Sequence, residues 1–181
     1  AGERARAAIQ SALPLRDVKF ITASGAMGAE DLDGSHLPFK IVYEAIDQSE
    51  GEDTTKACRR FLTEGAELIV FCGGDGTAKD VLKAVDRSVP VLGIPSGVKM
   101  HSGVFATTPR TAGELIRRFA EGGLGTKDGE VMDIDEEAFR SDRLQASLEG
   151  YMITLDEGQL MQPPKGVVAL SSDDEEKEEL G

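Results

Sequence analysis

The segment from Leu68 to Thr77, which reads LIVFCGGDGT, constrains the fold more than any other part of the sequence. Its five leading apolar residues predict a strand that is covered on both faces, as in the middle of a parallel sheet. Glycines follow at once, and a helical pattern begins directly after them. Such a junction directs backbone N–H groups and a helix N-terminus at one point, which suits a phosphate group. We therefore expect an α/β fold with an anion-binding loop after this strand.

Most of the chain alternates between helical and strand patterns, as in consecutive βαβ units. Helices are expected at residues 3–12, from Thr54 or Thr55 to Leu62, from the glycines to Asp86, and from Thr108 to Ala120. Strands are expected at residues 18–23, 39–45, 68–72 and 89–94. Beyond residue 127 the pattern contains short strand-like stretches without clear helices. The sequence thus predicts a Rossmann-like α/β nucleotide-binding domain over residues 1–127, followed by the start of a β-rich second domain with an acidic tail over residues 128–181.

The chain is strongly acidic, with a net charge of −13 at pH 7. Nucleic-acid binding needs a basic face, so we expect no nucleic-acid partner. No apolar run approaches the ~18 residues that cross a bilayer, so we expect no membrane association. Cys58 and Cys72 fit no metal or redox spacing and indicate a reducing compartment, in keeping with a cytoplasmic location. Binding of an anionic nucleotide by so acidic a chain requires local N–H groups, basic side chains and a divalent cation.

Asp75 is unexpected in a plain phosphate-binding loop, because a carboxylate repels a phosphate at a distance of a few ångströms. Its presence is explained if the carboxylate holds Mg²⁺ or takes a proton from an attacking hydroxyl, and both roles indicate phosphoryl transfer. The alternative is a tight turn in which Asp75 merely caps the helix. The motif by itself leaves both interpretations open.

A second glycine-rich loop, GIPSGVKMHSG at residues 93–103, follows the next strand. Both loops follow strands of parallel type, so both are expected at the carboxyl edge of the sheet, where open α/β folds bind ligands. The second loop supplies a cation, hydroxyl groups and an imidazole that the first loop lacks. Its candidate ligand-binding residues are Ser96, Gly97, Lys99, His101 and Ser102. The alternative is a solvated surface loop in which the lysine and the histidine have no role.

The motif GGDGT at residues 73–77 resembles the signature shared by NAD kinases, diacylglycerol and sphingosine kinases, and phosphofructokinases. Together with GIPSGVKMHSGVFATTP, it is most similar to archaeal and bacterial proteins classed as ATP- or polyphosphate-dependent NAD kinases. The similarity extends to GAMGAE at residues 25–30 and to EVMDIDEEAFR at residues 130–140. Several kinases share the short motif alone, whereas its combination with GVKMHSGVFA is much more specific.

This resemblance implies an enzyme whose active site lies between an α/β domain and a β-sandwich domain. It also implies that Asp75 is the general base that acts on the 2′-hydroxyl of the NAD adenosine ribose. We therefore hypothesise phosphoryl transfer from ATP or polyphosphate to NAD, giving NADP, with assistance from Mg²⁺ and no set of protein metal ligands assigned. The groups expected to hold phosphates are Gly73, Gly74, Gly76, Thr77 and Lys99, and the groups expected to contact the substrate are His101 or Ser102.

The sequence departs from the family pattern at both ends of the chain. NAD kinases usually carry a short Asn-acidic motif that contacts NAD at the start of the β domain, but this chain has no Asn. Asp133 is the nearest counterpart, and Asp133 and Asp135 are the candidate substrate-binding residues there. The family's opening strand, Asn-Pro loop and closing β strands are also missing, so we expect an incomplete piece of such a protein. The family and the strand edges of an unfinished β domain both favour a homo-oligomer, a dimer or a tetramer.

Two other functions remain open at this point. Another kinase with the GGDGT motif would act on a lipid or a sugar phosphate, although the sequence shows no basic amphipathic segment suited to a membrane surface. A non-catalytic nucleotide-binding protein would bind NAD or ATP and transfer no phosphate.

Overall fold

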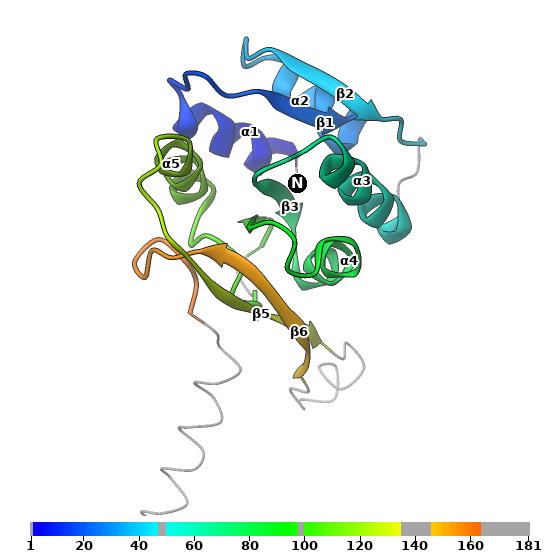
Figure 1. The fold of residues 1–181 in the computed structure, drawn as a ribbon, viewed down its shortest axis with the longest axis vertical. Coiled ribbons are helices and arrows are strands. Elements are labelled where there is room, and N and C mark those ends of the chain that lie inside the picture. The colour runs from blue at the N-terminus through cyan, green and yellow to red at the C-terminus, as the bar shows by residue number, and fades with distance from the viewer. Residues whose placement is uncertain (1, 47–49, 98–99, 135–145, 164–181) are drawn as a thin grey trace, which may run out of the picture.

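The computed structural model describes residues 2–46, 50–97, 100–134 and 146–163. Its helices are α1 (Gly2–Ala12), α2 (Ala29–Asp33), α3 (Gly51–Thr63), α4 (Asp75–Val85) and α5 (Pro109–Ala120), with a 3₁₀ turn η1 (Gly25–Met27). Its strands are β1 (Phe20–Ala23), β2 (Phe39–Tyr43), β3 (Ile69–Gly73), β4 (Val91–Pro95), β5 (Thr126–Ile134) and β6 (Ala146–Leu155). In Figure 1, β1 and β2 lie at one end of the molecule, and β5 and β6 lie toward the other. The alternation of strands and helices up to α5 confirms the predicted α/β class.

The strands form two sheets. β1 and β2 pair in parallel, and a larger mixed sheet has the strand order β3–β4–β6–β5. β3 and β4 run parallel in an unbroken register from Ile69↔Val91 to Gly73↔Pro95. Because their carboxyl ends are level, the loops that follow them start at the same edge of the sheet, as the sequence predicts.

Strand β3 is covered on both faces, because its side chains alternate between two apolar clusters. Ile69 and Phe71 pack in one cluster with residues of α4 such as Val81. Val70 and Cys72 pack against the other cluster, which holds residues of α1, β4 and α5. Figure 1 shows α1 and α5 on one side of β3, and α3 and α4 on the other. The prediction that both faces of this strand are covered is confirmed. The prediction that the strand lies in the middle of its sheet is not, since β3 is a terminal strand of its sheet in the described part of the chain.

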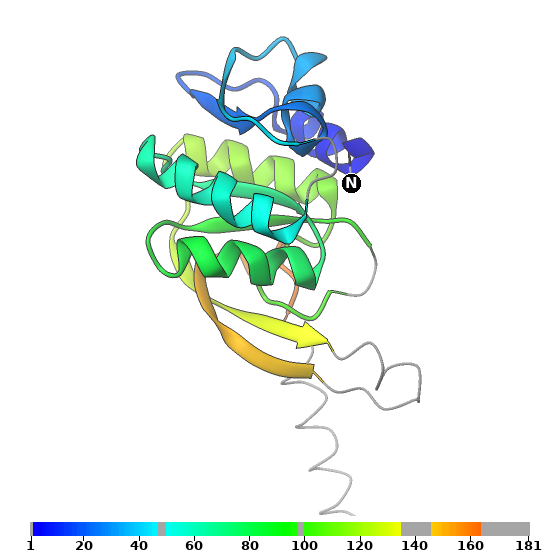
Figure 2. The same ribbon diagram turned by 90° about the vertical axis from the view of Figure 1, so that its right-hand side faces the viewer.

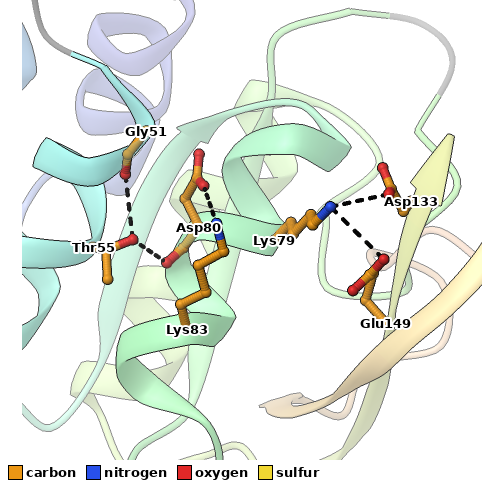
Figure 3. A network of polar contacts seen from close by, with 7 residues as sticks. All are labelled: Gly51, Thr55, Lys79, Asp80, Lys83, Asp133 and Glu149. Carbon is orange, nitrogen blue, oxygen red and sulfur yellow. Dashed lines mark hydrogen bonds and ion pairs between the residues drawn. The ribbon is translucent and has the colours of Figure 1, made fainter. Parts of the chain in front are cut away.

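Helix α3 begins before Thr54 and Thr55, which the sequence predicts as its N-cap. The N-cap is Glu50, whose N–H donates a 3.0 Å hydrogen bond to the Asp53 carboxylate and so closes the first turn. The Thr55 hydroxyl donates to the backbone carbonyl of Asp80 at 2.8 Å, which joins α3 to α4 instead (Figure 3). The prediction was wrong because an acidic pair upstream supplies the cap.

β5 and β6 form an antiparallel ribbon that packs against α4 (Figures 1 and 2). Val131 and Met152 are fully buried in the cluster that also holds Val81 of α4. The backbone of Gly150 comes close to α4, since a Cβ at that position would lie 3.1 Å from Leu82 Cδ2. The ribbon confirms the predicted change to β structure after α5.

The ribbon is continuous with the larger sheet. β6 meets β4 in parallel at Val91↔Thr154, and the Thr154 hydroxyl donates to the Val91 carbonyl at 2.7 Å. Both residues are fully buried, so this junction is part of the core. The division of the chain into two domains at residue 127 stays a prediction.

Candidate active site at the carboxyl edge of the sheet

The first glycine-rich loop is the junction between β3 and α4. Gly73 ends the strand, Gly74 is the N-cap, and Asp75 is the first helical residue. A Cβ on Gly73 would lie 2.3 Å from Thr77 Oγ1, so the Thr77 side chain packs over the strand end and excludes any larger residue there. Gly76 is the opposite case, because it is exposed and a Cβ there would meet no heavy atom within 4 Å. The loop is therefore packed at its strand end and open at its helix end.

The open end presents backbone donors. The first hydrogen bond of the α4 ladder runs from the Ala78 N–H to the Gly74 carbonyl at 3.0 Å, so the N–H groups of residues 75–77 precede the ladder. The macrodipole of this helix places partial positive charge at the same end. An anion beside Gly76 would meet both, which is the arrangement expected of a phosphate site.

The Asp75 side chain extends from the start of α4 to the second loop. Its Oδ1 accepts the N–H of Ser102 at 2.8 Å, and the N–H of His101 lies 3.0 Å from Oδ2 and 3.1 Å from Oδ1. A carboxylate offers about four lone-pair positions, so these contacts leave roughly one position on Oδ2 for another donor. The helix-capping interpretation is wrong, because Gly74 is the N-cap and the carboxylate binds the other loop.

The second loop is held at both of its ends. The Ser96 N–H donates to the Gly73 carbonyl at 3.0 Å, which keeps the two loops adjacent where they leave the strands. Ser102 is fully buried, and its Oγ accepts the N–H of Met132 on β5 at 2.9 Å. Ser102 therefore attaches the loop to the ribbon, and a contact between Ser102 and a substrate stays a prediction.

The remaining predicted groups of the second loop differ in their surroundings. His101 is half-buried, and its Nδ1 is buried with no hydrogen-bond partner among the described residues. Met100 of the same loop is buried, and a Cβ on Gly97 would lie 3.3 Å from the Met100 Cε. Lys99 and Asp135, which were both predicted as site residues, lie outside the described residues.

Asp133 lies on β5 and forms an ion pair with Lys79 of α4. Lys79 Nζ is 3.0 Å from Asp133 Oδ2 and 3.7 Å from Glu149 Oε1 on β6 (Figure 3). The hydrogen bond between the pair lowers the pKa of Asp133 and raises the pKa of Lys79. Sequence reasoning missed Lys79, although its position four residues after Asp75 was a signal, since that spacing puts two residues on one helix face.

Arg4 is a second cation that sequence reasoning missed. Its Nη1 donates to the Pro95 carbonyl at 3.3 Å, across a separation of 91 residues. Helix α1 thereby brings a half-buried guanidinium to the end of β4, where the second loop begins. No local pattern indicates this contact, because it depends on how α1 packs against the sheet.

The cysteines and acidic residues do not form a further site within the described ranges. Burial raises the pKa of Cys58 to about 12 and also raises the pKa of Cys72, so both thiols stay protonated near neutral pH. Residues 2–46, 50–97, 100–134 and 146–163 contain no group of three or more His, Cys, Asp or Glu side chains suited to a metal ion. The same ranges contain no helix long and apolar enough to cross a membrane.

Residues 3–124 match the model of the ATP-NAD kinase N-terminal domain family. The chain belongs to this kinase family. The match includes both glycine-rich loops, helices α2 to α5, and α1 from its second residue onward. No curated protein matches the chain.

Membership of the NAD kinase family confirms the resemblance drawn from the two loops. The matched range contains Asp75 and Lys79, whereas Asp133 and Glu149 on the ribbon lie beyond it. The ion pair of Lys79 therefore joins the family's N-terminal domain to a part of the chain that follows it.

Proposed function

We propose that this chain carries the nucleotide-binding part of an enzyme that transfers a phosphoryl group from ATP or polyphosphate to the 2′-hydroxyl of NAD, giving NADP. Membership of the NAD kinase family supports this reaction class. The observation that carries the proposal is the Asp75 carboxylate, which is fixed at the carboxyl edge of the sheet with one acceptor position to spare.

Asp75 is the general base in this proposal. The 2′-hydroxyl donates its hydrogen bond to Oδ2, and the proton passes to Asp75 as the hydroxyl oxygen attacks the terminal phosphorus of the donor. The bond between that phosphorus and the bridging oxygen breaks, and ADP or the shortened polyphosphate leaves with the bridging oxygen. The two backbone N–H donors hold the carboxylate in one orientation before the substrate arrives. Such preorganisation aligns the base with the hydroxyl without a further loss of side-chain freedom.

The phosphate groups bind at the N-terminus of α4. The N–H of Gly76, an exposed residue, and the positive end of the helix offset the overall negative charge of the chain locally. Thr77 packs on Gly73 and keeps the loop close to the strand end. The other predicted phosphate-binding or substrate-binding residues are Gly74, Ser96, Gly97, Lys99, His101, Ser102, Asp133 and Asp135.

Mg²⁺ is compatible with this site as a partner of the substrate phosphates. Mg²⁺ commonly takes one or two carboxylates together with phosphate oxygens and water. The free position on Asp75 Oδ2 can serve either a hydroxyl or a metal ion but not both at once, and we assign it to the hydroxyl. When bound, the cation would neutralise charge on the transferred phosphoryl group.

Replacement of the base tests the proposal in the full-length protein. Asp75→Asn keeps the size of the side chain but removes the proton acceptor, so we expect NADP formation to fall by about 10²- to 10⁴-fold with each phosphoryl donor. Asp80→Asn on the same helix is the matched control, because the Asp80 side chain pairs with Lys83 and takes no part in the loops. Turnover near the wild-type rate in Asp75→Asn would show that Asp75 is not the base.

The acceptor and the class of protein are tested by the same assay. Labelled ATP offered with NAD, a lipid and a sugar phosphate separates an NAD kinase from other kinases with this motif. A protein that binds NAD or ATP but transfers no phosphate to any acceptor would be a non-catalytic nucleotide-binding protein. We propose NAD as the acceptor, because the family match names NAD.

The assembly and location of the protein are further parts of the same proposal. We propose a homodimer or homotetramer in the cytoplasm, with NAD and the phosphoryl donor as its small-molecule partners. Light scattering on the full-length protein distinguishes these oligomers from a monomer.

A further inference from the structure

A closed ring of contacts passes through the Asp75 carboxylate. Asp75 accepts the N–H of Ser102, and Ser102 Oγ accepts the N–H of Met132 on β5. The next residue of β5, Asp133, pairs with Lys79 at 3.0 Å. Lys79 lies one helical turn from Asp75 on α4, which closes the ring. The ring therefore contains α4, the second loop and β5.

Side chains join α4 directly to β5 where Lys79 pairs with Asp133 (Figure 3). The second loop is attached to β5 at a further point, because the Gly103 N–H donates to the Glu130 carbonyl at 2.8 Å. The spacing between β5 and the start of α4 thus controls where the N–H groups of the loop stand relative to the carboxylate. Glu149 offers Lys79 a second acceptor from β6, so both strands of the ribbon are held at this point.

We propose that Lys79, acting through Asp133, is a positioning residue that holds the Asp75 carboxylate in its working orientation. The proposal rests on the proposed function, since it assigns Lys79 a part in keeping the base aligned. Lys79 itself touches neither substrate nor phosphate in this proposal, because its ammonium is shared between two carboxylates.

The structure contains a second ion pair that serves as a matched control. Arg87 follows the C-terminal end of α4 and pairs with Asp128 of β5 at 2.7 Å. It joins the same helix and strand as Lys79 does, but the end of α4 is roughly 15 Å from Asp75 along the helix axis. Both pairs are partly exposed, so neither is expected to contribute much to stability. If loss of one pair lowers activity more than loss of the other, the difference therefore reflects how near each pair lies to Asp75.

The test compares Lys79→Met with Arg87→Met in the full-length protein. Lys79→Met opens the ring, and we expect kcat for NAD phosphorylation to fall about tenfold while KM for NAD stays within about twofold. Lys79→Arg can restore the ion pair and should recover most of the lost kcat. Arg87→Met should keep kcat within about twofold of the wild-type value.

Amide hydrogen exchange gives a readout that is independent of activity. Opening the ring should speed the exchange of the His101 and Ser102 N–H groups, which donate to the Asp75 carboxylate. The exchange of both groups should be unchanged in Arg87→Met. Faster exchange in Lys79→Met but not in Arg87→Met would support the proposal that Lys79 positions the Asp75 carboxylate.

Two outcomes overturn the proposal, namely an unchanged kcat in Lys79→Met and an equal loss in both variants. If wild-type protein phosphorylates no NAD with any donor, the proposed function fails instead. The exchange measurement then tests by itself whether Lys79 positions the Asp75 carboxylate. Identical exchange of the His101 and Ser102 N–H groups in wild type and Lys79→Met would show that it does not.

Discussion

The carboxyl edge of β3 and β4 and the ribbon of β5 and β6 are held in place by different forces. At the edge, directional hydrogen bonds from Ser96, His101 and Ser102 fix the two loops to each other. The ribbon is held chiefly by burial of Val131 and Met152 against α4. Hydrogen bonds set an orientation at modest net energy, whereas apolar burial supplies more energy with little directional preference.

This difference indicates that the carboxyl edge orients the reacting groups, whereas the ribbon contributes to the stability of the fold. A general base needs a fixed direction more than it needs binding energy, and the backbone N–H groups beside Asp75 supply that direction. The ribbon supplies stability, and it contacts the edge through Ser102 and through the pair of Lys79 with Asp133. Substitutions in the two regions should therefore differ in what they change.

The largest expected effect on stability comes from the ribbon core. Met152 is fully buried, so Met152→Ala should lower the free energy of unfolding by about 2–5 kcal/mol, through lost apolar contact and the cavity that remains. Tyr151→Ala is the matched control on the exposed face of the same strand, and it should cost less than about 1 kcal/mol. Urea unfolding measures both values, and equal losses would contradict the assignment of the core to one face of β6.

An intermediate effect is expected from the first loop, where two glycines face different surroundings. Gly73→Ala places a methyl group against Thr77 and should lower the free energy of unfolding by about 1–3 kcal/mol. Gly76→Ala meets open space in the first turn of α4, so it should leave stability unchanged or raise it by up to about 1 kcal/mol. Its methyl group would nevertheless hinder phosphate from reaching the N–H, so NADP formation should fall. A Gly76→Ala protein with unchanged activity would place the phosphates elsewhere.

The smallest effect is the pH dependence of the pair of Lys79 and Asp133. The pKa of Asp133 is lowered from 3.8 by its hydrogen bond with Lys79, so its stabilising contribution is present above that value and is lost as pH falls through the lowered pKa. The pKa of Lys79 is raised from 10.5, so its contribution is lost only as pH rises above that value. The difference in unfolding free energy between wild type and Lys79→Met should therefore be constant near neutral pH and shrink in acid. Urea unfolding from about pH 7 to about pH 2 measures it, and a difference that does not change across this range would contradict the ion pair.

The sequence predicted the parts of this fold that depend on local pattern. The apolar run before Gly73 and the Thr108–Pro109 start of α5 both correspond to elements of the structure. The start of α3 was missed because an acidic cap at Glu50 took the place of the expected threonine. Helix α2 was also missed, since its five residues are too few to show a helical pattern of apolar positions that differs from a turn.

The candidate site could be predicted only in part. The sequence indicated that Asp75 and the second loop share one edge of the sheet, because parallel strands leave their following loops on the same side. It did not indicate that the carboxylate accepts the N–H groups of His101 and Ser102, since backbone donors have no signature in the side chains. Nor did it indicate the contact between Lys79 and Asp133, which are 54 residues apart.

The order of strand, glycines and helix is a local property of the chain, and it determined the α/β class, the family resemblance and the placing of a carboxylate at a helix N-terminus. The tertiary structure alone decided what that carboxylate contacts, which cation reaches the ribbon, and how far the ribbon stands from α4. These are contacts between distant segments, and they depend on packing against a shared core whose geometry no local window of residues contains.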